Sequence, residues 1–184
     1  IKTLELSSDS AICREDVEFL SAIGKEIYEL LENIYITQAP ILKNREELIS
    51  YSSSLYADSP ELQEHLYKIL KDRDNLADTY IKPFQALLLH GRSPKLTRSC
   101  FGYARLEPPI YEKGRIIRGA IVSLIPSGPA SEVAAPVTSE VIGTLLEEPA
   151  LLKALQSLNK ESFTKQLEEI LLRFYKSTVQ TRLH

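Results

Sequence analysis

The chain has 184 residues, of which 43% are hydrophobic and 26% are charged, and its formal net charge is −3. This composition is typical of a soluble globular domain that buries its own core, and the acidic balance argues against a nucleic-acid-binding surface. No apolar run approaches the ~20 residues of a membrane span, and Cys13 and Cys100 are too far apart for a metal motif, so we expect two free thiols in a cytoplasmic protein.

The first part of the chain is predicted to be mainly helical. Residues 1–6 alternate weakly between apolar and polar types, which is compatible with a short strand. Apolar residues recur at helical spacing over 15–32, after an acidic start, and predict a helix. The β-branched and aromatic run 34–41 predicts a strand. Two more helices are predicted, over 44–55 after an asparagine cap and over 59–71 from a Ser-Pro start.

The second part of the chain contains three predicted strands followed by helices. The strands cover 86–89, 100–106 and 116–125, and we expect Pro108-Pro109 to end the second of them. The third is almost continuously apolar, which is typical of a strand covered on both faces. Helical periodicity returns over residues 131–146, 149–158 and 162–175. Four strands mixed with six helices predict a layered α/β or α+β domain.

The ends of the chain suggest that it is part of a longer polypeptide. The sequence begins at Ile1 and contains no methionine. We expect residues 1–32 to be a helical lead-in or linker from an upstream domain, and residues 33–184 to form the domain itself.

The histidine that follows the predicted strand 86–89 is the candidate functional residue. An imidazole at the end of a rigid strand can exchange a proton or a phosphoryl group, and Gly91 and Arg92 could hold the resulting anion. The alternative is that His90 only bonds a backbone carbonyl. Of the other two histidines, His65 falls within an amphipathic helix, where we expect a structural or solvated role, and His184 is the last residue.

A second polar segment, residues 70–81, precedes this strand. Its Arg73 is either an ordinary cation at the end of a helix or a side chain folded back toward His90. The residues alone leave both interpretations open.

Segments 70–81 and 86–93 together resemble the active-site region of enzyme IIA domains of the mannitol/fructose type, from the bacterial phosphoenolpyruvate-dependent sugar phosphotransferase system. The similarity is greatest to the enzyme IIA-like domain that ends mannitol operon activators and antiterminator-type transcriptional regulators. In those regulators Leu-Leu typically precedes the histidine and Arg-Ser follows it, as here. Supporting similarity is found in residues 101–110, 121–126 and 141–155, and the resemblance covers about residues 33–178.

This resemblance implies a mixed sheet flanked by helices, with His90 as the phosphoacceptor. Arg73 matches the family arginine near the phosphorylated imidazole, and Thr79 matches a small polar residue of the same pocket. Arg92 follows the regulator motif. The implied chemistry is phosphoryl exchange between two nucleophiles, for which we expect no cofactor and no metal.

The resemblance departs from the transport enzymes at one position. Those enzymes carry a second histidine near the place of Ala134 or Ala135, and this chain has none there. The departure favours a phosphohistidine that regulates sugar-operon transcription over a turnover enzyme. A transport enzyme IIA that relays phosphate, and an inert scaffold of the same fold, are the alternatives. The implied partners are the phosphocarrier HPr or an enzyme IIB and upstream domains of the same polypeptide, with self-association left open.

Overall fold

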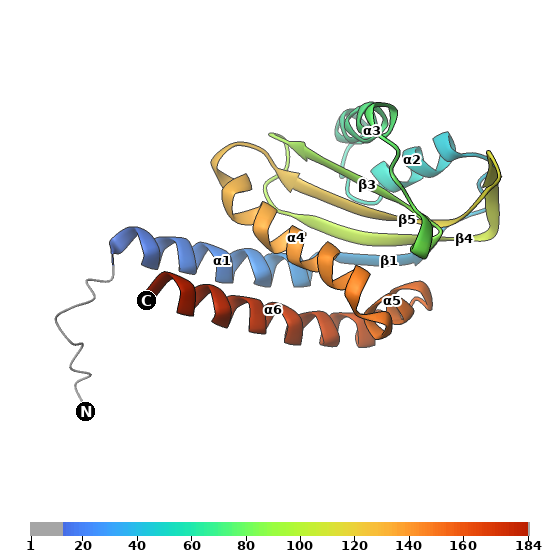
Figure 1. Cartoon of the computed structure of the whole chain (residues 1–184). Helices are drawn as coiled ribbons and strands as arrows, with labels where there is room; N and C mark the ends of the chain where they lie inside the picture. Colours follow the sequence, from blue (N-terminus) through green and yellow to red (C-terminus); the bar gives the residue numbers. More distant parts are fainter. Residues whose placement is uncertain (1–12, 184) are drawn as a thin grey trace.

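A five-stranded mixed sheet lies between two layers of helices in the computed structural model, which describes residues 13–183 (Figure 1). The strands follow the spatial order β1-β4-β5-β3-β2. Their bounds are β1 Ile34–Gln38, β2 Tyr80–Ile81, β3 Ala86–Ser93, β4 Cys100–Glu112 and β5 Arg115–Pro126. The helices are α1 Arg14–Glu32, α2 Arg45–Ser54, α3 Pro60–Leu76, α4 Ser131–Glu147, α5 Pro149–Gln156 and α6 Lys160–Leu183. The predicted α/β architecture is confirmed.

The two faces of the sheet carry separate cores because side chains alternate along each strand. Leu87 and Leu89 of β3 are buried against α2 and α3, whereas Leu88 packs on the opposite side with residues of α1, α4, α5 and α6. Figure 1 shows α2 and α3 on one face of the sheet and the other four helices on the opposite face. Strand β3 therefore lies between two helical layers, and its polar residues 90–93 are placed by apolar residues 86–89.

The six predicted helices are confirmed to within a few residues, except that α6 continues to Leu183. Strands differ more. The prediction that Pro108-Pro109 ends a strand is wrong: β4 pairs with β5 up to Arg105, is interrupted around the prolines, and pairs again from Ile110 to Glu112. The two-residue strand β2 was not predicted, and β3 extends four residues beyond Leu89, to Ser93. The weak strand expected over 1–6 and the terminal His184 lie outside the described residues.

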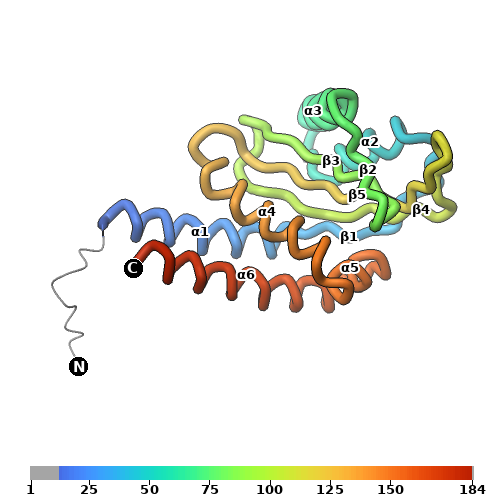
Figure 2. Tube along the Cα trace, in the orientation of Figure 1, coloured from blue at the N-terminus to red at the C-terminus, as the bar shows by residue number. Residues whose placement is uncertain are grey.

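Helix α1 packs into the core of the domain. Its Ile23 and Leu30 are fully buried in the cluster that contains residues of α4 and α6. The chain trace shows α1 alongside α6, so that the first and last helices lie next to each other (Figure 2). That residues 1–32 lead in from an upstream domain stays a prediction.

Both cysteines are free thiols, as predicted. Cys13 is exposed and Cys100 is buried, and burial raises the pKa of the Cys100 thiol to about 11. None of the helices described is both long and apolar enough to cross a membrane.

Candidate functional site

The short strand β2 leaves the outer edge of β3 open at His90. Strand β5 pairs with β3 along its whole length, but β2 pairs only with Ala86 and Leu87. The last backbone contact on the β2 side is the N–H of Leu88, which donates to the carbonyl of Thr79 (2.8 Å). His90 follows two residues later, where no other strand among those described covers the edge. It is half-buried and lies near the carboxyl end of two parallel strands, the usual place for a ligand site in such sheets.

Two hydrogen bonds fix the ring of His90 and its tautomer. Arg73 Nε lies 3.1 Å from His90 Nε2, and the carbonyl oxygen of Leu88 lies 3.2 Å from His90 Nδ1. A guanidinium can only donate and a carbonyl can only accept. We therefore assign the proton to Nδ1, which donates to Leu88, and the lone pair to Nε2, which accepts from Arg73. Nδ1 thus bonds a backbone carbonyl, as the alternative interpretation of His90 expected, and Nε2 keeps an unprotonated lone pair. That His90 is a phosphoacceptor stays a prediction.

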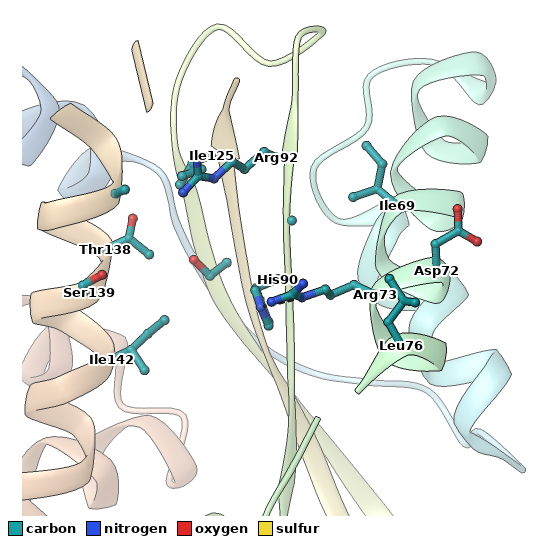
Figure 3. Close-up of a pocket in the computed structure, with 13 residues that line it drawn as sticks. Ile69, Asp72, Arg73, Leu76, His90, Arg92, Ile125, Thr138, Ser139 and Ile142 are labelled. Carbon is teal, nitrogen blue, oxygen red and sulfur yellow. Dashed lines mark hydrogen bonds between the residues drawn. The ribbon is translucent and has the colours of Figure 1, made fainter. Parts of the chain in front are cut away.

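Arg73 reaches His90 from the opposite face of the sheet. It lies in the last turn of α3, a helix that packs through Leu66 and Leu70 on the α2–α3 side. The guanidinium passes the open edge of β3 to meet the ring, as Figure 3 shows. Gly91 lets α3 lie close to β3, because a Cβ at this position would overlap with Cγ2 of Ile69 on α3. The fold decides between the two interpretations of Arg73: its side chain folds back toward His90.

His90 opens into a pocket of about 730 Å³ between α3, β3, β5 and α4. Its polar lining, apart from Asp72, consists of basic groups and hydroxyls: His90, Arg73, Arg92, Ser123, Thr138 and Ser139. Arg92 is exposed, and its guanidinium forms no hydrogen bond or ion pair with the described residues. In Figure 3, α4 presents Thr138 and Ser139 on the side that faces β3. The structure thus brings His90, Arg73 and Arg92 to one pocket that is suited to an anion.

Thr79 is not part of this pocket. Its side chain is buried, and its hydroxyl bonds Asp74 and accepts from Arg45 Nη2 (3.1 Å). The reason is local: α3 ends at Leu76, so the chain returns with Thr79 beside Asp74 instead of His90. Only the Thr79 backbone carbonyl approaches the site, through Leu88. We therefore leave Thr79 out of the candidate site.

An ion-pair network holds the end of α3 next to Arg73. Arg45 Nε donates to Asp74 Oδ2 (2.8 Å) and Arg45 Nη1 to Glu112 Oε2 (3.1 Å). The Asp74 carboxylate raises the pKa of Arg45 above its usual value. The Arg115 guanidinium, 2.6 Å from Asp78, lowers the pKa of that carboxyl. These partners are distant in the sequence, so no local pattern predicted the network.

Three hydroxyl residues of the pocket escaped the sequence reasoning. Ser123 interrupts the apolar run of β5 and is paired with His90 in register, which is the one signal that could have revealed it. Thr138 and Ser139 lie on α4 without a local motif. Ala135, near the place where the second histidine of transport enzymes was expected, also lines the pocket.

His65 has the structural role expected of it. Its Nε2 lies 2.9 Å from the hydroxyl oxygen of Ser93, a fully buried residue, and that oxygen also accepts from the N–H of Lys95 (3.1 Å). The contact holds the turn that follows β3.

Comparison with known proteins supports the same fold. Residues 29–170 match the family described as phosphoenolpyruvate-dependent sugar phosphotransferase system, EIIA 2. The chain is similar to the nitrogen regulatory protein IIA-Ntr from Neisseria meningitidis (17% identity, 77% of this chain and 94% of that one, TM-score 0.54). It is also similar to a putative IIA protein, PtxA, from Streptococcus mutans (14%, 82% and 96%, TM-score 0.50).

A third solved structure, IIA mannitol from Escherichia coli, has 17% identity over 72% of this chain and 96% of that one, with a TM-score of 0.49. No curated protein matches the chain. At these identities the structural similarity concerns the fold, whereas the family match covers most of the domain, including α3, His90 and α4. The chain belongs to the EIIA type 2 family of the phosphoenolpyruvate-dependent sugar phosphotransferase system.

Proposed function

We propose that His90 Nε2 accepts a phosphoryl group and that this phosphohistidine is a regulatory signal in a bacterial transcriptional regulator of a sugar operon. The donor is the phosphohistidine of HPr or the phosphocysteine of an enzyme IIB. The observation that carries the proposal is the hydrogen-bond pair on the ring, which leaves Nε2 unprotonated beside a guanidinium.

The transfer is an in-line exchange at phosphorus. The Nε2 lone pair attacks, the N–P or S–P bond of the donor breaks, and the donor imidazole or thiolate leaves with the electron pair. The proton on Nδ1 stays in its hydrogen bond to Leu88, which stabilises the positive charge that the ring gains. Before the attack, Arg73 Nε moves its hydrogen bond from Nε2 to a phosphoryl oxygen of the donor, which frees the lone pair, and Arg92 supplies a second cation from the same strand as His90.

The composition of the α4 wall favours regulation over relay. Ala135 lines the pocket where a second imidazole could otherwise assist release of the phosphoryl group. The other polar residues of α4 in the pocket, Thr138 and Ser139, carry hydroxyls, which are weaker nucleophiles than an imidazole. A phosphohistidine that is held instead of passed on adds a charge close to −2 at the sheet edge. That charge changes how neighbouring domains dock on this face.

Exposed apolar residues around the pocket suit a protein donor. Leu76 lines the pocket and is 79% exposed, and Leu146, one helical turn beyond the pocket residue Ile142, is 56% exposed. Such residues around a polar centre are typical of a transient protein interface.

Labelling with phosphoenolpyruvate, the first phosphotransferase enzyme and HPr tests the proposal. The wild-type protein should gain one phosphoryl group that is stable to base and labile to acid, and His90→Ala should gain none. His65→Gln is the matched control and should label normally. Arg73→Ala should slow labelling about 10- to 100-fold, because one hydrogen bond to a charged group is lost.

Three outcomes separate the alternatives. An unlabelled wild-type protein indicates the inert scaffold and refutes the proposal. Rapid, quantitative transfer from the labelled protein to a purified enzyme IIB indicates a transport relay. Slow or one-way labelling supports regulation.

A further inference from the structure

The end of α3, which carries Arg73, is anchored by a single buried side chain. Leu66 and Leu70 are the buried residues of this helix, and both lie before its last turn. Every residue from 72 to 78 is exposed except Asp74, whose side chain is 8% exposed. The last turn of a helix frays where it buries no apolar side chain. The position of Arg73 therefore depends on what Asp74 binds.

Arg45, the first residue of α2, binds Asp74 through both carboxylate oxygens. Its Nε donates to Asp74 Oδ2 (2.8 Å) and its Nη2 to Asp74 Oδ1 (2.5 Å), which is a bidentate contact. Nη1 donates to Glu112 Oε2 of β4 (3.1 Å), and Nη2 also donates to the hydroxyl of Thr79 (3.1 Å). One guanidinium thus joins α2, the end of β4 and the chain on both sides of the turn that follows α3.

The charges at the end of α3 make a cation necessary there. Asp72, Asp74 and Asp78 lie in or near the last turn, where the partial negative charge of a helix end disfavours carboxylates. Arg45 neutralises the buried one, and the Asp74 carboxylate in turn raises the pKa of Arg45. Asp78 pairs with Arg115, but both side chains are about half exposed, so this pair holds the segment only weakly.

We propose that Arg45 is a positioning residue for Arg73. Adjacent residues of a helix point about 100° apart, so the contact that holds Asp74 against α2 and β4 directs Arg73 toward the edge of β3. From there Arg73 Nε reaches His90 Nε2 at 3.1 Å. Arg45 does not line the His90 pocket, so it acts on the ring only through Arg73. Its control of the ring contact needs no phosphoryl transfer, whereas its effect on labelling rests on the proposed function.

The nitrogen-15 resonances of the His90 ring report the contact without any phosphorylation. In Arg45→Gln the resonance of the unprotonated Nε2 should shift most of the way to its position in Arg73→Ala, because both variants withdraw the guanidinium from the ring. The Nδ1 resonance should remain that of a protonated nitrogen, since Nδ1 bonds the Leu88 carbonyl instead of Arg73.

Two further variants separate this role from the general attachment of α3 to α2. Lys71→Gln is the matched control, because it removes another ion pair between these helices, with Glu46, but lies before the last turn of α3. It should leave the ring resonances unchanged. Arg45→Lys keeps a positive charge beside Asp74 without the fork geometry, and should give an intermediate shift of Nε2.

Labelling kinetics test the consequence for phosphoryl transfer. Arg45→Gln should slow the labelling of His90 by phosphorylated HPr about three- to tenfold, because the hydrogen bond from Arg73 is weakened but its side chain is still present. Adding Arg45→Gln to Arg73→Ala should slow labelling no further, because Arg45 acts through the arginine that is already absent. A merely structural role predicts the same loss of rate in both backgrounds.

An Nε2 resonance in Arg45→Gln that matches the wild type, or a loss of rate that is equally large with and without Arg73, overturns the proposal. If the wild-type protein is not labelled, the proposed function fails, and the ring resonances of His90 still decide whether Arg45 positions Arg73.

Discussion

Replacement of Gly91 by alanine should test how closely the position of α3 controls the site. A Cβ at Gly91 would overlap with Cγ2 of Ile69, which lies one helical turn before Arg73. Two carbon atoms require about 3.5–4.0 Å, so α3 must move away from β3 by about 1 Å. The same movement lengthens the 3.1 Å contact between Arg73 Nε and His90 Nε2 beyond hydrogen-bond range.

The expected cost has two parts. Overpacking at this contact should lower the free energy of unfolding by about 1–3 kcal/mol. Loss of the Arg73 contact should slow the labelling of His90 about tenfold, because the arginine no longer meets the phosphoryl group. Urea unfolding measures the first effect, and the initial rate of phosphorylation by phosphorylated HPr measures the second.

A compensating variant makes the reasoning refutable. Ile69→Ala removes the Cγ2 that blocks the new Cβ, so the double variant should recover most of the labelling rate that Gly91→Ala loses. Gly143→Ala is the control: a Cβ there meets nothing within 4 Å, and the helix should gain up to about 1 kcal/mol. Normal labelling of Gly91→Ala, or a double variant no faster than the single one, would show that the position of α3 does not set the rate.

Two further predictions concern groups outside the pocket. Burial raises the pKa of the Glu26 carboxyl, so the folded protein favours the protonated form of this side chain. The free energy of unfolding therefore falls as the pH rises through that raised pKa and the buried carboxyl becomes charged. Glu26→Gln should therefore be more stable than the wild type by about 1 kcal/mol at pH 7.5 and lose this advantage near pH 4. The control, Glu32→Gln at an exposed position, should show no such trend. Urea unfolding measures both, and a difference between Glu26→Gln and the wild type that does not change with pH contradicts the prediction. Arg45→Gln leaves the Asp74 side chain, 8% exposed, without its cation and should lower the free energy of unfolding by about 2 kcal/mol. Adding Asp74→Asn should recover part of this loss. Thermal unfolding measures both variants, and additive losses of stability count against the network.

Local sequence patterns predicted the elements whose ends and buried face are set by their own residues. Helix α3 begins where Ser59 caps it and Pro60 fits its first turn, and the Ser59 hydroxyl does accept from the Leu62 amide (3.2 Å). The predicted end of β4 at the prolines was wrong, because pairing with β5 resumes at Ile110. The hydrogen bonds that continue the strand come from β5, and the sequence of β4 alone does not contain this information.

The candidate site was predictable only as far as its residues lie on one segment. His90 and Arg92 belong to β3 and follow from the end of an apolar run. Arg73 approaches from the other face of the sheet, which requires that β2 begin only at Tyr80 and leave the edge of β3 open beside His90. Thr79 shows the converse: a similar residue type at a matching place was insufficient, because the end of α3 brings it to Asp74.

The two-residue length of β2 underlies the chemistry of this site. A longer β2 would pair with the outer edge of β3 beyond Leu88, cover the carbonyl that holds Nδ1 of His90, and separate Arg73 from the ring. With the edge open, α3 on one face and α4 on the other both contribute to one pocket. Under the proposed function, a phosphoryl group on His90 attracts Arg73 of α3. Its arrival therefore favours one position of α3 relative to β3, which gives a single charge a means of altering the surface that neighbouring domains contact.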